Sequence, residues 1–337
     1  MNNFYKMMFF MSMMIGTMVA ISSYSWMGMW MGLEINLLSI IPLISSTKNA
    51  LNTEAALKYF ITQAIASTLL LFAMIMLSMN MMYNISMNNY FSLILNTSLL
   101  TKMGAAPFHF WFPEVMEGLN WFNSMIMLTW QKIAPMVLLM YTNFTFYYLI
   151  LIIIMSMMIS GIMGLNQISL RKILAYSSIN HIGWMIAAMM FTETIWSYYF
   201  CIYTIITINI ILIFKIYNIF YLKQLFMTMN KNNLFKFFFI MNFFSLGGLP
   251  PFLGFMPKWL TIQALIQNNF YFLTIIMILM TLMTLYFYLR ITFSTLLLKM
   301  NELSYYKMSN INSTMMIMFN FITLMSLIFC TMIFNLI

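Results

Sequence analysis

Two prolines interrupt a long apolar segment of the chain, in the run Gly104-Ala-Ala-Pro107-Phe108-His-Phe-Trp-Phe-Pro113-Glu114. Proline removes a backbone donor and clashes with the preceding turn, so a helix is expected to break here. A gap-free match lies 144 residues later, with the same Gly, Pro, Phe and Pro, in Gly248-Leu-Pro-Pro251-Phe252-Leu-Gly-Phe-Met-Pro257-Lys258. The two runs therefore predict two broken helices that belong to a repeated unit.

The segments around these breaks are long enough to cross a bilayer, which takes about 20 apolar residues. Eleven such segments occur, at 4–22, 24–45, 56–78, 90–118, 120–141, 145–165, 171–191, 195–218, 236–268, 270–292 and 313–336. The broken segments are the fourth and the ninth, so they cross the membrane in opposite directions. We therefore predict an all-α integral membrane protein, a single polytopic domain over residues 1–337. It would contain two inverted five-helix repeats, 1–141 and 145–292, and an extra C-terminal helix, 313–336.

The composition excludes a water-soluble protein. Of the 337 residues, 63% are hydrophobic and 6% are charged, whereas about 25% are charged in a soluble domain. The net charge of +9 comes from 15 Lys and Arg against six Glu, and it forms no basic stripe along the chain. Nucleic acid is therefore not expected as a partner.

Intrinsic redox or metal chemistry is also not expected. Cys201 and Cys330 are far apart in apolar runs, and His109 and His181 cannot supply the four axial ligands of a di-haem protein. No glycine-rich phosphate loop or hydrolase-like carboxylate pair is present. The 43 methionines stand where Leu or Ile would serve, which indicates the base bias of an organellar genome rather than metal binding.

Cations mark one side of the predicted membrane topology. When the loops are numbered alternately, the connections on the N-terminal side hold or adjoin Lys6, Lys48, Lys58, Arg171, Lys172, Lys215, Lys223, Lys231, Lys236, Arg290, Lys299 and Lys307. The opposite side has none. By the positive-inside rule, the N-terminal side faces the cytoplasm or the mitochondrial matrix, and the C-terminus faces the other compartment.

Three lysines remain that topology does not explain. Lys102, Lys132 and Lys258 fall inside apolar segments, and Glu34 lies at the middle of the second segment. A charged side chain at that depth costs about 2.5–3.5 kcal/mol on insertion scales. These four residues are therefore candidates for a functional role.

The residue types in this set suit proton transfer. Burial disfavours a charged amine and a nearby carboxylate stabilises it, so a paired lysine can exchange protons near neutral pH. Glu34 and Lys102 could form such a pair, and Lys132 could receive the released proton. His181, near the centre of segment 171–191, could order water between Lys132 and Lys258, because imidazole titrates close to neutral pH.

Structural roles are the alternatives for several of these groups. Lys258 could snorkel to an interface, Glu34 could hold helices together with Asn36, and His181 could satisfy a serine hydroxyl. His109 lies beside the break at Pro107, where a free backbone carbonyl would use it structurally. Interface anchoring or a solvated face is favoured for Lys58, Lys215, Glu114 and Glu117.

Five runs resemble one known family, the antiporter-like membrane-arm subunits of mitochondrial NADH-ubiquinone oxidoreductase, respiratory complex I. The runs are Trp30-Met-Gly-Leu-Glu34-Ile-Asn36, Glu54-Ala-Ala-Leu-Lys58-Tyr-Phe, Lys102-Met-Gly-Ala-Ala-Pro107-Phe-His109-Phe-Trp111-Phe-Pro113-Glu114-Val, Leu174-Ala-Tyr-Ser177-Ser178-Ile-Asn-His181 and Gly247-Gly-Leu-Pro250-Pro-Phe-Leu-Gly254-Phe-Met-Pro257-Lys258-Trp. The resemblance covers essentially the whole chain. Its length and eleven segments are similar to the shortened animal form, and its methionine content is insect-like.

The resemblance implies a multi-pass protein of the mitochondrial inner membrane, with its N-terminus in the matrix and its C-terminus in the intermembrane space. Such a chain takes part in proton translocation driven by electron transfer from NADH to ubiquinone, as a subunit of the proton-translocating NADH:ubiquinone reductase. The FMN, iron–sulfur clusters and ubiquinone would be on partner subunits, with no cofactor or metal in this chain. The implied partners are other membrane-arm subunits, including neighbouring antiporter-like chains, and phospholipids.

The resemblance also implies roles for single residues. Glu34 looks like the family's glutamate, Lys102 like its partner in the first broken helix, Lys132 like the central lysine and Lys258 like the lysine of the second broken helix. His181 matches a polar relay position. Two other functions stay open at this point: a free-standing cation/proton antiporter, and a structural spacer in a large membrane assembly.

Overall fold

The structure, a computed structural model, describes residues 2–46, 49–83, 88–142, 145–229, 233–250, 252–297 and 320–321. These ranges are helical, with one isolated bridge between Ser169 and Tyr221 and no strand, as the all-α prediction requires. The chain forms two compact units, Met1–Ser156 and Met157–Ile337, and the boundary falls within α8 (Phe146–Leu165). Outside the described residues lie Lys48, Lys231, Pro251, Lys299, Lys307, Cys330 and almost all of the predicted helix 313–336.

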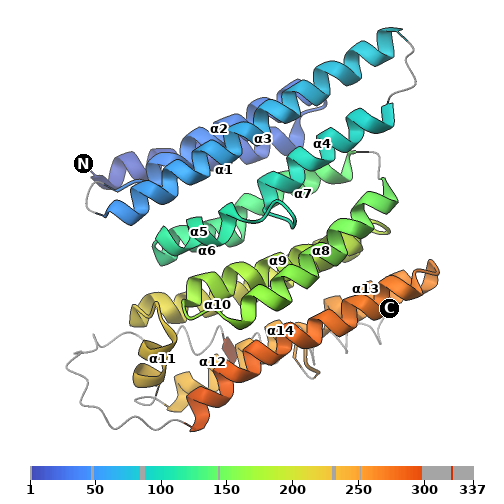
Figure 1. Ribbon diagram of the computed structural model, residues 1–337. Coiled ribbons are helices and arrows are strands. Elements are labelled where there is room, and N and C mark those ends of the chain that lie inside the picture. Colours follow the sequence, from blue (N-terminus) through green and yellow to red (C-terminus); the bar gives the residue numbers. More distant parts are fainter. Residues whose placement is uncertain are drawn as a thin grey trace. The chain divides into compact units, whose positions relative to one another are not determined.

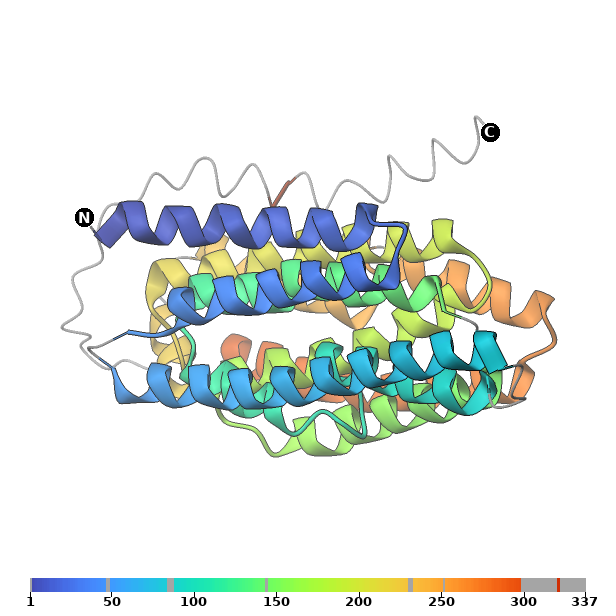
Figure 2. The same ribbon diagram turned by 90° about the horizontal axis from the view of Figure 1, so that it is seen from above.

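The first unit is a bundle of antiparallel neighbours (Figure 1). Its elements are α1 (Asn2–Ser22), α2 (Trp26–Ile44), α3 (Ala50–Tyr83), α4 (Asn88–Met103), α5 (Trp111–Gly118), α6 (Trp121–Leu128), the short 3₁₀ turn η1 (Trp130–Lys132) and α7 (Ile133–Met140). Helix α2 packs between α1 and α3, and α4 packs against α3 and α7. Seen from above, α1 and α2 run side by side (Figure 2).

Helices α1 and α2 approach closely because a glycine faces the contact. A Cβ added to Gly32 would lie 2.5 Å from the Ala20 backbone nitrogen and 2.7 Å from its Cα. Small residues let helix backbones approach in a membrane, where packing rather than the hydrophobic effect drives helix association. The α1–α2 contact therefore depends on the absence of a side chain at position 32.

The segment predicted at 120–141 is not one continuous helix. It contains α6, the 3₁₀ turn η1 and α7. Pro135 explains the interruption, because it has no N–H to donate to the carbonyl of Gln131 and its ring clashes with that carbonyl. Lys132 bonds instead in the tighter pattern, its N–H donating to the Thr129 carbonyl at 3.3 Å. The interruption therefore lies at the predicted central lysine.

The second unit is built around one buried helix, α9 (Leu170–Met189). Most of its residues are buried, and it packs against α10 (Glu193–Tyr217), α13 (Phe255–Gln267) and α14 (Tyr271–Leu297). A helix that is buried all round occupies the centre of its bundle. The remaining elements are α11 (Leu222–Met229), which a search for 20-residue apolar segments could not predict, and α12 (Asn233–Gly247).

Both predicted broken helices are interrupted, and the two breaks begin in the same way. Gly104 ends α4 with a φ of 74°, and Gly248 ends α12 with a φ of 77°. These left-handed glycines close helix C-termini in the Schellman arrangement. The hydrogen bonds match at an offset of 144 residues: Gly104 N to Thr101 O, Ala105 N to Leu100 O and Phe108 N to Ala105 O, against Gly248 N to Ser245 O, Leu249 N to Phe244 O and Phe252 N to Leu249 O.

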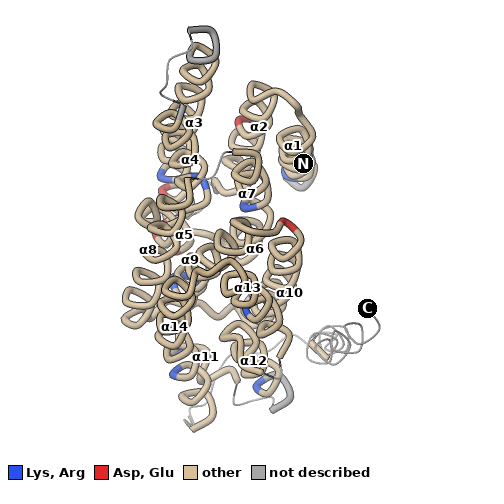
Figure 3. Tube along the Cα trace, turned by 90° about the vertical axis from the view of Figure 1, so that its right-hand side faces the viewer, with Lys and Arg blue, Asp and Glu red and all other residues tan. Residues whose placement is uncertain are grey.

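Within the described residues, six helices are long and apolar enough to cross a membrane by themselves. They are Phe4–Ser22, Trp26–Ile44, Ala50–Met79, Phe146–Leu165, Glu193–Tyr217 and Tyr271–Leu297. The predicted count of eleven is therefore not confirmed. The two segments with breaks and the segment with η1 consist of shorter helices, and α9 is more polar. Charged residues are sparse along the Cα trace of both units (Figure 3).

A Gly32→Val substitution tests the close contact between α1 and α2. Its side chain would overlap the Ala20 backbone, and overpacking of this kind costs about 1–3 kcal/mol. We expect a lower thermal aggregation midpoint in gently solubilised membranes. Gly247→Ala is the matched control, because the nearest atom to its Cβ would be 3.7 Å away. Equal midpoints for the two variants would show that the α1–α2 contact does not limit stability.

Candidate functional site

Lys102 lies in the last turn of α4, directly before the first break. Its side chain is 8% exposed, and its backbone carbonyl accepts a hydrogen bond from Gln63 Nε2 at 3.4 Å. The last carbonyls of a helix carry partial negative charge, which favours a cation. The break therefore provides a helix C-terminus that stabilises an ammonium group inside an apolar bundle.

Glu34 lies on the neighbouring α2 and interacts electrostatically with Lys102. Both side chains lie in the described part of the chain, and they do not form an ion pair with each other. Glu34 Oε1 is buried and has no hydrogen-bond partner in the part of the chain that the structure describes. An unsatisfied buried carboxylate oxygen is costly. Movement of Glu34 onto Lys102 would give this oxygen a partner and remove that cost.

Between Lys102 and the turn η1 lies a polar cavity of about 20 Å³. Its walls are Leu33, Asn36, Leu37, Tyr59, Gln63, Lys102, Gln131 and Pro135. A cavity of this size with several polar partners can hold one water molecule. Two of its wall residues, Asn36 and Gln131, are joined by reciprocal amide hydrogen bonds, Asn36 Nδ2 to Gln131 Oε1 at 3.0 Å and Gln131 Nε2 to Asn36 Oδ1 at 2.8 Å.

Lys132 follows Gln131 in the turn and is 2% exposed. Its ammonium lies 5.5 Å from the ring centroid of Phe112, within cation–π range. The preceding Trp130 donates its indole N–H to Thr17 Oγ1 on α1 at 3.2 Å. Side chains on both sides thus hold the turn that carries Lys132.

The second unit places Lys258 at the second break. Its ammonium donates to the carbonyl of Gly247 at 2.8 Å and to that of Leu246 at 3.4 Å, at the C-terminus of α12. The side chain is 6% exposed, so it lies inside the unit instead of extending to an interface. A Cβ on Gly248 would lie 2.7 Å from Lys258 Cδ. Glycine at position 248 therefore permits the left-handed turn and also leaves space for the lysine side chain.

His181 and Lys258 are both neighbours of Trp184. Trp184 is one turn after His181 on α9, and the Lys258 ammonium lies 5.9 Å from its ring centroid. His181 Nδ1 is 2.8 Å from the Tyr199 hydroxyl, and its ring centroid is 5.0 Å from that of Tyr203. A hydroxyl both donates and accepts, so the tyrosine can exchange a proton with the imidazole.

Several residues at these sites were not predicted from the sequence. Tyr199 and Tyr203 are four residues apart on α10 and buried, a spacing that puts both on one helix face. Gln131 could have been noted, because an amide directly before the predicted central lysine is unusual in an apolar segment. For Trp184, nothing in the sequence separates a site residue from an ordinary core aromatic.

Other polar groups have structural roles. His109 Nδ1 lies 3.3 Å from the Pro107 carbonyl, as predicted for a histidine beside the break. Lys58 forms ion pairs at 2.9 Å with both Glu54 and Glu114, and these side chains are 42%, 60% and 56% exposed. Exposed pairs contribute about 0–1 kcal/mol each. Lys58 is therefore a solvated link between α3 and α5.

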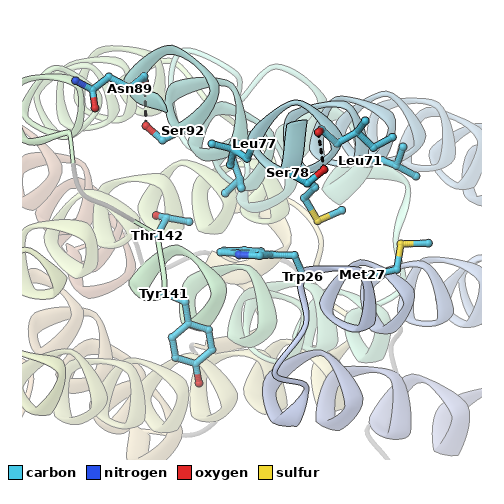
Figure 4. A pocket seen from close by; sticks show the side chains of 12 residues that line it. Trp26, Met27, Leu71, Leu77, Ser78, Asn89, Ser92, Tyr141 and Thr142 are labelled. Atoms are coloured by element: carbon cyan, nitrogen blue, oxygen red, sulfur yellow. Dashed lines mark hydrogen bonds between the residues drawn. The ribbon is translucent and has the colours of Figure 1, made fainter. Parts of the chain in front are cut away.

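A larger pocket of about 620 Å³ lies at the end of the first unit where α2 begins and α7 ends (Figure 4). Among the described residues that line it, none carries a formal charge. Its hydroxyls at Ser78, Ser92 and Thr142 donate to carbonyls of their own helices. Apart from Tyr141, the described residues that line this pocket carry no titratable side chain.

Comparison with known proteins assigns the fold to a family. The model of the NADH:quinone oxidoreductase/Mrp antiporter transmembrane family matches residues 23–284. The chain belongs to this family of multi-pass membrane proteins, as the resemblance predicted.

The relatives narrow the comparison to one kind of subunit. The chain is 50% identical over 332 residues to NADH-ubiquinone oxidoreductase chain 2 of Anopheles gambiae, covering 97% of each chain. It is 46% identical to the protein of that name from Locusta migratoria, over 90% of this chain and 89% of the other. Among solved structures, a chain of respiratory complex I from Thermus thermophilus matches with a TM-score of 0.84 at 21% identity, over 95% of this chain and 77% of that one. This last likeness concerns the fold alone.

A Lys132→Met substitution asks whether the buried ammonium stabilises the fold. Methionine has a similar shape, can contact the Phe112 ring and carries no charge that must be desolvated. We expect the thermal midpoint of the membrane assembly to stay equal or rise. A lower midpoint would show that Lys132 is needed for stability.

Proposed function

We propose that the chain is a core membrane-arm subunit of respiratory complex I and translocates protons through Glu34, Lys102, Lys132, His181 and Lys258. One observation carries the proposal: three buried ammonium groups lie at helix interruptions, in a chain that is 50% identical to NADH-ubiquinone oxidoreductase chain 2 of a mosquito. Apolar residues at these positions would give the bundle an equal or higher free energy of unfolding.

The proton is handled first in the first unit. When Glu34 closes onto Lys102, the carboxylate stabilises the ammonium and the proton is retained. When the pair opens, Lys102 loses this stabilisation and releases the proton through water. The buried Glu34 oxygen without a hydrogen-bond partner corresponds to the open pair. Neutral Lys132 accepts it and becomes an ammonium.

In the second unit, the proton passes along hydroxyl and imidazole groups. His181 accepts a proton on one ring nitrogen and releases one from the other, while the Tyr199 hydroxyl, 2.8 Å from Nδ1, holds the ring in orientation. Lys258 is the last acceptor. The carbonyls of Leu246 and Gly247 stabilise its protonated form.

The matching breaks support two inverted half-repeats, 1–141 and 145–292. Their glycines have nearly equal φ values, 74° and 77°. Broken helices in corresponding positions of two halves are typical of ion translocators built from inverted repeats. Each half would supply one interrupted helix with a lysine beside it.

The location and partners follow from the same proposal. The protein would lie in the mitochondrial inner membrane with its N-terminus in the matrix and its C-terminus in the intermembrane space. Other membrane-arm subunits, among them antiporter-like chains, and phospholipids would surround it. The FMN, iron–sulfur clusters and ubiquinone would be on partner subunits.

A free-standing cation/proton antiporter is the second candidate. A chain of the Mrp complex from Dietzia shares the fold with a TM-score of 0.72 at 16% identity, over 83% of this chain and 58% of that one. Gentle solubilisation of native membranes, followed by an in-gel test for NADH oxidation, separates the two candidates. Migration in a large NADH-oxidising particle supports the complex I subunit. Migration alone, under conditions that keep complex I intact, supports the antiporter.

The relay is tested by Lys132→Met in the assembled complex. We expect the number of protons moved per NADH oxidised to fall, because the apolar side chain cannot accept a proton. The measurement is proton uptake or release in sealed vesicles, with NADH oxidation recorded in parallel. Lys58→Met, which removes an exposed lysine, is the control and should keep the normal ratio. A normal ratio in the Lys132 variant would instead support a structural spacer.

A further inference from the structure

The amide pair between α2 and the turn η1 lies next to two of the proposed relay groups. Asn36 is 4% exposed and exchanges two hydrogen bonds with Gln131, at 3.0 and 2.8 Å. On one side the pair lines the cavity that also contains Lys102. On the other side, Gln131 is directly followed by Lys132. Lys102 therefore lines the same cavity as the pair, and Lys132 lies in the same turn as Gln131.

Paired amides cannot conduct a proton. A side-chain NH₂ group only donates and a side-chain carbonyl only accepts, so neither group can take up a proton and pass on another as water or a hydroxyl does. The reciprocal bonds also place the two amides against each other. While they stay paired, a water in the cavity beside Lys102 is cut off at this wall.

The cavity can hold a water molecule beside Lys102. It has room for one water molecule, and its polar wall residues are Asn36, Tyr59, Gln63, Lys102 and Gln131. Such a water can accept from the ammonium and donate to an amide oxygen of the pair. Release of the Lys102 proton would therefore change the hydrogen bonds of the Asn36–Gln131 pair first.

The backbone under Gln131 is one that can rearrange. Pro135 cannot donate to the Gln131 carbonyl, and residues 130–132 form a 3₁₀ turn. A 3₁₀ stretch inside a helix often marks a hinge. Rotation of this turn would move the Gln131 amide and Lys132 together, because they are consecutive residues.

We propose that the Asn36–Gln131 pair is the gate between Lys102 and Lys132. The paired amides close the route, and their separation lets water join the cavity to Lys132. This inference rests on the proposed relay and adds two positioning residues that do not themselves carry the proton.

Two double variants of the assembled complex give opposite results for a gate and for a packing contact. Asn36→Leu with Gln131→Met keeps the shape of the pair and excludes water, since apolar contacts stay dry. Asn36→Leu with Gln131→Glu puts a carboxyl group, which can both accept and release a proton, in the same place. For a gate, the Leu/Met variant should lower the protons moved per NADH to the Lys132→Met value, and the Leu/Glu variant should recover most of the loss.

A packing role predicts the reverse order. Replacing both partners with apolar groups of similar shape is nearly neutral, whereas a carboxyl beside leucine is left unsatisfied. A wild-type ratio in the Leu/Met variant, or a lower ratio in Leu/Glu than in Leu/Met, would overturn the proposal. Thermal midpoints and NADH oxidation rates, measured on the same particles, show whether each variant has assembled.

Two controls complete the design. Asn123→Leu removes a different amide contact of α2, because Asn123 Nδ2 donates to the Leu43 carbonyl at 3.0 Å, and Asn123 does not line the cavity. It should stay near the wild-type ratio, and a loss as large as that of Leu/Met would assign the effect to any lost amide contact of α2 instead of the pair. A wild-type ratio in Lys132→Met means that the relay itself is wrong. A low ratio in Lys132→Met with a wild-type ratio in Leu/Met means that only the gate is wrong.

Discussion

Inside a bilayer, a backbone carbonyl without an N–H partner has no water to bond. The described helices satisfy that constraint except where glycine or proline interrupts them, and those interruptions create strong local electric fields in apolar surroundings. Lys102 lies at the end of α4, and Lys258 donates to the end of α12. Lys132 lies in the turn that Pro135 forces. Backbone carbonyls and buried lysines therefore depend on each other, since each offsets part of the cost of placing the other in a dry environment.

This dependence explains how far the sequence could predict the fold. The two breaks, which begin at Gly104 and Gly248, and the buried lysines follow from residue type and position alone, because proline disfavours a continuous helix and a charge is costly in an apolar segment. The family resemblance predicted the same residues. The interruption at η1 was missed, although Pro135 is in the segment, because the apolar run 120–141 has the length of one continuous membrane span. The short helix α11 was missed because its eight residues are too few for a membrane span.

The site itself was predicted less completely than the fold. Sequence patterns indicate which side chains are expensive to bury, but they do not show which neighbours satisfy them. The partnership of Asn36 with Gln131 joins residues 95 positions apart, and that of His181 with Tyr199 depends on how α9 packs against α10. Both rest on neutral polar groups, whose small cost in an apolar segment makes them hard to distinguish from ordinary helix contacts.

The two lysines at the breaks do not occupy equivalent positions in the two matching motifs. Lys102 corresponds to Leu246, and Lys258 corresponds to Glu114, at the offset that superimposes the two motifs. The first lysine ends the leading half-helix, whereas the second belongs to the following half-helix and reaches back to the carbonyls of its predecessor. Gene duplication would then have fixed the position of the electric field at the helix ends. It would have left open which half-helix of each break provides the lysine. Internal symmetry is thus a guide to electrostatics in such a fold, and a poor guide to residue correspondence.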